Sequence, residues 1–153
     1  MSRRLASVML LATAALALTG IAAGSTHKTK MNFAATLNVG QAKPTPKGTK
    51  NGASGKFTAT YDSTTKKITW KLTFTHLSGP ATAAHIHAGK RGVANPVPLI
   101  PLCGPSCTSG QTGTTGMITD AQLAQIKAGA TYVNVHTTKN PAGEIRGQIV
   151  MAM

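Results

Sequence analysis

The residues of this chain best suited to chemistry are three histidines, two of which stand one residue apart. His85 and His87 flank Ile86 in the stretch AAHIHAG. Successive side chains of a β-strand point to opposite faces, so both imidazoles would share one face and Ile86 would take the other. Imidazole nitrogens bind copper and zinc, and His136 on a neighbouring strand would supply a third ligand. The spacing predicts either a copper or zinc site or a polar face that satisfies its own hydrogen bonds.

Further polar residues share this side of the last two strands. In YVNVHT and EIRGQIV, polar residues alternate with apolar ones, which is typical of strands with one buried face. Antiparallel partners keep a constant sum of residue numbers, so pairing His136 with Glu144 would place Asn134 opposite Arg146. Should the strand of AAHIHAG flank this hairpin, three imidazoles and one carboxylate would converge, as a metal site or as a polar network that holds the strands in register. The predicted supporting face consists of Tyr132, Asn134, Glu144 and Arg146.

The elements that must position these residues are mostly short strands. Apolar and polar residues alternate throughout KITWKLTFT at 67–75, and the pattern recurs in MNFAATLNV and KFTATYD. The prolines of NPVPLIPL restrict that segment to a sheet edge or to an extended segment. A capping box between Thr119 and Gln122, with Gly129 as the stop signal, predicts one short helix at about residues 120–128. The sequence therefore predicts an all-β fold, an antiparallel β-sandwich or barrel similar to immunoglobulin or superoxide dismutase folds, with about seven or eight strands.

The N-terminal segment has the organisation of a secretory signal peptide. Arg3 and Arg4 precede an apolar run from Leu5 to about Leu18, and small residues follow near Gly24. A retained anchor is the alternative, because the run approaches the ~20 residues that a membrane-spanning helix needs. The predicted organisation is a signal peptide at 1–24, a polar leader at 25–30 and a β domain at 31–153. We expect an exported protein, periplasmic, at the cell surface or secreted, that is not integral to the membrane after cleavage.

The two cysteines, Cys103 and Cys107, lie close together in CGPSC. In an exported protein such a pair is expected to form a disulfide bond. A zinc site with two thiolates would need a second pair of ligands at suitable spacing, which this segment lacks.

The chain is strongly basic, with a formal net charge of +13 and only three acidic residues. Aromatic residues make up only 4% of it, and the lysines are spread singly rather than clustered among stacking aromatics. This pattern argues against specific nucleic-acid binding. The charge instead predicts a solvated basic surface with weak attraction to anionic polymers or lipids.

Three motifs together resemble one known family. HIHAG at 85–89, YVNVHT at 132–137 and NPAGEIRGQI at 140–149 look like the CHRD domain, named after chordin and also found in bacterial exported proteins. The resemblance runs from about Met31 to the C-terminus and implies an extracellular β-rich binding or structural module, often without assigned activity. It does not imply that a lone domain binds growth factors as chordin does. The family motif residues present here are His85, His87, Asn134, His136, Glu144 and Arg146.

Two classes of function remain. The first is a non-enzymatic exported module that binds an envelope component or a protein partner, and the second is a copper- or zinc-binding protein that uses His85, His87 and His136. A superoxide dismutase needs a second metal site, for which too few histidines remain. A hydrolase needs a base near Ser106 or a carboxylate pair, and Glu144 is the only glutamate. We therefore expect no enzymatic activity.

Overall fold

The computed structural model describes residues 28–153. The predicted signal peptide at 1–24 and the first part of the predicted leader lie outside the described residues. The first strand begins at Lys30, one residue before the predicted start of the β domain. In the described part of the chain, every helix is too short and too polar to cross a bilayer.

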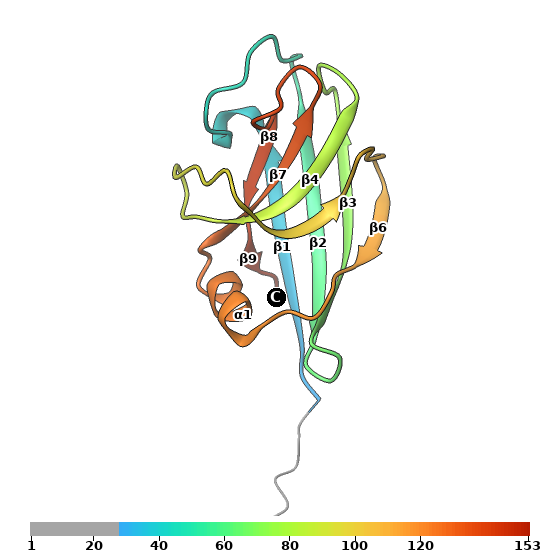
Figure 1. Cartoon of the computed structure of the whole chain (residues 1–153), viewed down its shortest axis with the longest axis vertical. Coiled ribbons are helices and arrows are strands. Elements are labelled where there is room, and N and C mark those ends of the chain that lie inside the picture. The colour runs from blue at the N-terminus through green and yellow to red at the C-terminus, as the bar shows by residue number, and fades with distance from the viewer. Residues whose placement is uncertain (1–27) are drawn as a thin grey trace, which may run out of the picture.

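The described chain forms nine strands, one α-helix and one turn of 3₁₀-helix (Figure 1). The strands are β1 (Lys30–Asn38), β2 (Ser54–Asp62), β3 (Lys67–Thr75), β4 (Ala81–Ala88), β5 (Pro98–Cys103), β6 (Gln111–Thr114), β7 (Thr131–Thr137), β8 (Ile145–Gln148) and β9 (Val150–Met151). The helix α1 spans Asp120–Lys127, and the 3₁₀ turn spans Val39–Gln41. The predicted capping box is present, with Thr119 and Gln122 each accepting from the other's backbone N–H.

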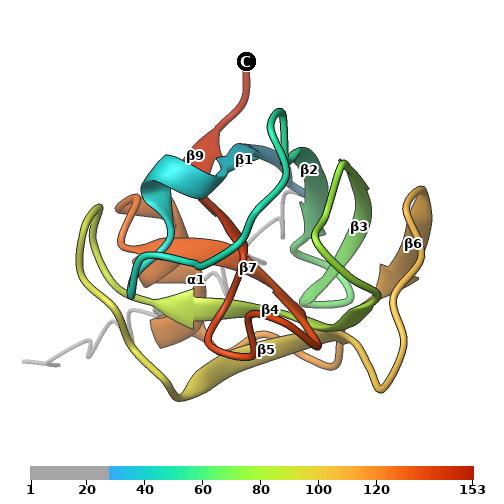
Figure 2. The same ribbon diagram turned by 90° about the horizontal axis from the view of Figure 1, so that it is seen from above.

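All strands belong to one antiparallel sheet with the order β5-β4-β7-β8-β1-β2-β3-β6, and β9 pairs with β1. Seen from above, the sheet curls into a nearly closed barrel around its core (Figure 2). β5, the proline-containing strand, lies at one edge of the sheet, as predicted, because proline cannot donate to a second neighbour. The all-β prediction is confirmed, and the strand count slightly exceeds the expected number.

The core lies inside the curled sheet and is built from alternate residues of each strand. Along β3 the apolar residues Ile68, Trp70 and Leu72 are buried while their polar neighbours are exposed. Ile86 of β4 and Val135 of β7 pack into the same core from the opposite side of the barrel. Because strand parity is fixed by these buried residues, the side chains next to Ile86 must point away from the core.

The outer side of β7 and β8 is covered by two loops, one at residues 39–53 and one at residues 89–97. The guanidinium of Arg146 donates to the carbonyls of Val93 (2.8 Å) and Lys90 (2.9 Å) in the second loop. As a result, Tyr132, Asn134 and Arg146 are 2%, 5% and 1% exposed. The predicted polar face exists, but it is a second buried layer rather than a solvated surface, because the loops exclude water from it.

The predicted disulfide between Cys103 and Cys107 is present. It follows β5 directly, and the backbone N–H of Cys107 donates to the carbonyl of Ala81 at the start of β4 (3.0 Å). The bond therefore closes a short loop that is tied to the strand carrying His85 and His87.

Candidate metal centre

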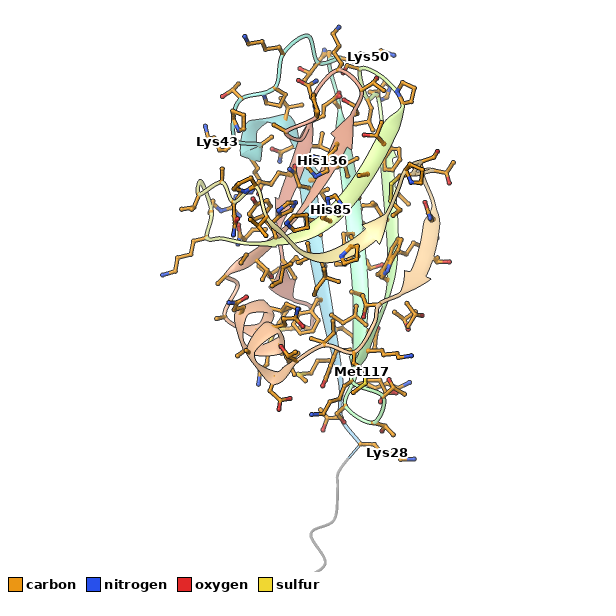
Figure 3. All side chains as sticks on the ribbon, in the orientation of Figure 1. Lys28, Lys43, Lys50, His85, Met117 and His136 are labelled. Carbon is orange, nitrogen blue, oxygen red and sulfur yellow. A yellow bond between two sulfur atoms is a disulfide. The ribbon has the colours of Figure 1, made fainter. Side chains whose placement is uncertain are left out.

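Three imidazoles from two adjacent strands converge outside the core. His85 and His87 come from β4 and His136 from β7, which are paired strands. Each residue offers one ligand nitrogen, and these atoms all lie within 4.8 Å of one another. The ring centroids are 5.1 Å apart for His85 and His136, 5.6 Å for His85 and His87, and 5.8 Å for His87 and His136. His85 and His136 lie side by side in Figure 3, and we call the three residues the histidine cluster.

The backbone determines which nitrogen of His87 carries the proton. Its Nδ1 lies 3.2 Å from the carbonyl oxygen of Val97, which can only accept a hydrogen bond, so Nδ1 is the protonated nitrogen. Nε2 then carries the lone pair. This atom is buried and has no hydrogen-bond partner in the described structure. A buried acceptor without a donor costs free energy, and a cation would satisfy it.

His136 is held in the same tautomer by the turn between β7 and β8. Its Nδ1 lies 2.9 Å from the carbonyl oxygen of Pro141, so its Nε2 is also unprotonated. That Nε2 lies 3.2 Å from Nδ1 of His85. Two nitrogens bound tetrahedrally to one zinc ion at 2.0–2.1 Å would stand about 3.3 Å apart. The separation therefore suits either a hydrogen bond between the rings or a shared metal ion.

An aromatic stack fixes the position of His87. Its ring is nearly parallel to that of Tyr132, at an interplanar angle of 10° and a centroid distance of 5.2 Å. On the ring of Tyr132 lies the guanidinium carbon of Arg146, 3.4 Å from the centroid. The hydroxyl of Tyr132 accepts from the backbone N–H of Asn95 (2.9 Å) and donates to its carbonyl (3.1 Å). Loop 89–97 and the stack therefore hold each other in place.

The predicted register of β7 and β8 is confirmed, since Asn134 pairs with Arg146 and Tyr132 with Gln148. The side-chain nitrogen Nδ2 of Asn134 donates to the carbonyl of Ala142 (3.0 Å). Its Oδ1 is buried without a hydrogen-bond partner among the described residues. Asn134 thus places a second unsatisfied acceptor on the face that carries the histidine cluster.

Glu144 does not join the imidazoles, contrary to the predicted convergence of three imidazoles and one carboxylate. Its fully buried carboxylate accepts from the N–H and hydroxyl of Ser78 (2.7 and 2.6 Å), the hydroxyl of Thr137 (2.7 Å) and Nδ2 of Asn140 (3.3 Å). Thr137 lies on the same side of β7 as the core residues Val133 and Val135. Because Thr137 donates to Glu144, the carboxylate points to that side and away from the histidines. Burial alone would raise the pKa of Glu144, but these hydrogen bonds outweigh it and hold the pKa below its usual value.

All three imidazoles are stabilised in the neutral form that a metal ligand requires. Burial, then repulsion from His136 and His85, lowers the pKa of His87 to about 4. Burial and the neighbouring His136 lower the pKa of His85, and burial lowers that of His136 against the hydrogen bond to Pro141. The cluster is therefore uncharged at neutral pH, and little proton competition opposes a cation there.

A pocket of about 190 Å³ adjoins the cluster. His87, Tyr132, Asn134 and His136 line it from the strands, and Lys43 lines it from loop 39–53. Asn95 and several prolines and alanines, from loop 89–97, the β7–β8 turn and loop 39–53, form the rest of its wall. We call it the side pocket. It leaves room for a small molecule next to two of the three imidazoles.

Some contributors to this site carry no signal in the sequence. The carbonyls of Val97 and Pro141 select the histidine tautomers, and any residue has such a carbonyl. Lys43 is one lysine among many in a loop without regular structure. The asparagine in NPAG could have been noticed as a turn residue, since Asn140 exchanges hydrogen bonds with the backbone of Lys47.

The comparisons with known proteins agree with the motifs. The family model of the CHRD domain matches residues 33–149, which covers all the strands from β2 to β8 and most of β1. No curated protein and no solved structure matches the chain. Since the match spans well over half of the sequence and includes HIHAG, YVNVHT and NPAGEIRGQI, the chain belongs to the CHRD domain family.

Proposed function

We propose that this chain is an exported, non-enzymatic CHRD module that binds one copper or zinc ion through His85, His87 and His136. The observation that carries the proposal is Nε2 of His87, a buried lone pair without a donor, beside two further imidazoles. Two of the three rings are held by backbone carbonyls in the tautomer that leaves Nε2 free, which is how proteins commonly orient ligating histidines.

The ligand set limits the choice of metal. Three neutral imidazoles without a carboxylate or thiolate suit zinc and copper, whereas calcium and magnesium prefer oxygen ligands. Nitrogens bound tetrahedrally to one zinc ion stand about 3.3 Å apart, so closing the cluster from its 4.8 Å limit needs a nitrogen–nitrogen separation to shrink by at most about 1.5 Å. Rotation about the side-chain torsions of the half-buried His85 and His136 suffices for that.

Two considerations support the absence of enzymatic activity. A copper and zinc dismutase needs a second set of ligands, and the other described histidine, His76, is exposed at the end of β3 and contacts the hydroxyl of Thr75 (3.0 Å). Both aspartates lie elsewhere, since Asp62 ends β2 and Asp120 begins α1. A structural or carrier role for the ion is therefore the simpler proposal.

Metal analysis of the purified mature protein without an affinity tag tests the proposal. We expect stoichiometric copper or zinc, and a rise in the free energy of unfolding of about 2.7 kcal/mol when free metal is 100 times the Kd. The variants His85→Gln and His136→Gln should lose both effects, whereas His76→Asn should keep them. An unchanged melting temperature with either metal, and no retained metal, would contradict the proposal.

The basic surface supports a second role, attachment to an anionic envelope component. The sequence has 16 Lys and Arg residues against three acidic ones, and the described residues contain one salt bridge, Lys66 to Asp120 (3.3 Å). Binding to anionic lipid vesicles should weaken steeply between low and physiological salt, because exposed charges are screened. Salt-independent binding would instead indicate a specific partner.

Export itself is tested by N-terminal sequencing of the protein from cell fractions, with cleavage near Gly24 expected.

A further inference from the structure

We infer that the bound ion keeps one coordination position open to the side pocket, and that a small oxygen-donor monoanion with one remaining proton, of the hydrogencarbonate type, occupies it. This inference rests on the proposed metal site and names the ligand that the site takes. Three imidazoles leave a fourth position on zinc or copper, and proteins with three ligands commonly fill it with water or an exogenous molecule. His87 and His136 both line the pocket, so that position faces it.

The charge balance calls for an anion. Three neutral imidazoles bring no negative charge, so a divalent ion would leave the half-buried site with two uncompensated positive charges. The chain has only three carboxylate side chains. Glu144 is occupied by Ser78, Thr137 and Asn140. The two aspartates end β2 and begin α1, and neither belongs to the histidine cluster. Among the described residues, no carboxylate side chain therefore lies at the cluster to compensate the ion.

The charged side chains beside the pocket are positive, opposite in sign to the inferred anion. Lys43 lines the pocket, and the guanidinium of Arg146 lies over the ring of Tyr132, which also lines it. Both favour an anion over a neutral ligand or a second cation. The Arg146 guanidinium is already committed to two backbone carbonyls, so Lys43 is the cation available to a ligand.

The polar atoms of the pocket define the rest of the ligand. Oδ1 of Asn134 is buried and lacks a donor, and Asn134 lines the pocket. Its Nδ2 donates to Ala142, so the amide is held with Oδ1 as the free acceptor. A ligand with an O–H group satisfies this atom, whereas azide or acetate cannot. The volume of about 190 Å³ corresponds to roughly six waters, which admits a small oxoanion but not a large cofactor.

The test titrates the copper(II)-loaded full mature protein with sodium hydrogencarbonate and, separately, with azide, and follows the visible and electron paramagnetic resonance spectra. We expect a saturable change with both anions, and tighter binding of hydrogencarbonate. Lys43→Gln should weaken binding roughly three- to tenfold, since a nearby partly screened charge is removed. Lys50→Gln, in the same loop but away from this pocket, is the matched control (Figure 3).

The outcomes separate this inference from the proposed function. Retained copper with spectra that neither anion changes would overturn the inference and leave the metal site standing. Tighter binding of azide than of hydrogencarbonate would overturn the assigned ligand class. Equal weakening by Lys43→Gln and Lys50→Gln would overturn the role of the pocket. Failure to bind copper or zinc at all, seen directly by metal analysis, would overturn the proposed function and the inference with it.

Discussion

The ring of His87 stacks on the ring of Tyr132, with planes 10° apart and centroids at 5.2 Å. These residues are not sequence neighbours but pair across β4 and β7. Because Tyr132 is in turn bound to the backbone of Asn95, the stack connects a possible metal ligand to loop 89–97. Changes in that loop should therefore be felt at the histidine cluster, which makes the stack a useful target for mutagenesis.

The variant Tyr132→Phe keeps the ring but removes the two hydrogen bonds to Asn95. We expect a loss of roughly 1–2 kcal/mol in the free energy of unfolding, because the partly buried backbone N–H and carbonyl of Asn95 lose their partner. Loop 89–97 should exchange its amide hydrogens faster, and the Kd for metal should rise, because the loop no longer anchors the ring that stacks on His87. Urea denaturation and hydrogen exchange measure these effects. Unchanged exchange in the loop would show that Tyr132 does not hold it.

The variant Glu144→Gln tests the buried carboxylate. The charged group accepts hydrogen bonds from Ser78, Thr137 and Asn140, and an amide would turn one acceptor into a donor facing donors. We expect a loss of roughly 2–3 kcal/mol in the free energy of unfolding at pH 7. Metal binding should persist at temperatures where the variant is folded, since Glu144 does not contact the histidines. Loss of metal from the folded variant would contradict this assignment.

Acid should remove the stabilisation that Glu144 provides. The pKa of its carboxyl is lower in the folded protein than in the unfolded chain, whose ordinary value is 4.5. As the pH falls below about 4.5, the unfolded state therefore binds more protons than the folded state. The stabilisation by Glu144 is complete above pH 4.5 and is lost as the pH falls from there toward the pKa of the folded protein. Stability measured from pH 7 to pH 3 should fall more steeply below 4.5 in the parent protein than in Glu144→Gln.

In the metal-free protein, His87 should make stability depend on pH over a higher range than Glu144 does. Its pKa is about 4 in the folded state, against an ordinary value of 6.5. Between these two pH values, His87 is therefore protonated in the unfolded chain but largely neutral in the folded protein. The stabilisation is therefore present above pH 6.5 and is lost as the pH falls toward about 4. At about 1.4 kcal/mol per pKa unit, the contribution is at most roughly 3.5 kcal/mol. The slope should be smaller in His87→Gln.

Gly143 leaves room for Asn134, and a side chain there should disturb the pocket. A Cβ at Gly143 would overlap the amide of Asn134, and its φ of +117° disfavours other residues. We expect Gly143→Ala to lower the free energy of unfolding by at least about 2 kcal/mol. Gly92→Ala is the matched control, because Gly92 also has a positive φ (+81°) but nothing within 4 Å, and should cost about 1 kcal/mol. Similar losses in both variants would mean that the contact with Asn134 is unimportant.

The sequence indicated the strands well because each has one clear apolar face. Ile68, Trp70 and Leu72 alternate strictly, and β3 lies where that alternation predicts it. The register of β7 and β8 could be predicted because the NPAG turn joins them directly. The sequence could not predict that β4 lies beside β7, which brings His85 to His136. No short loop connects these strands, and pairing between distant segments leaves no periodic signal in the sequence.

The sequence by itself determined that His85 and His87 share a face, that Asn134 opposes Arg146, and that Cys103 can reach Cys107, because these are local relationships of strand parity, register and spacing. Only the tertiary structure decided that loops 39–53 and 89–97 bury this face, that Glu144 turns toward Ser78, and that carbonyls fix the histidine tautomers. These features depend on the packing of irregular loops and on backbone atoms, which are chemically alike in every residue.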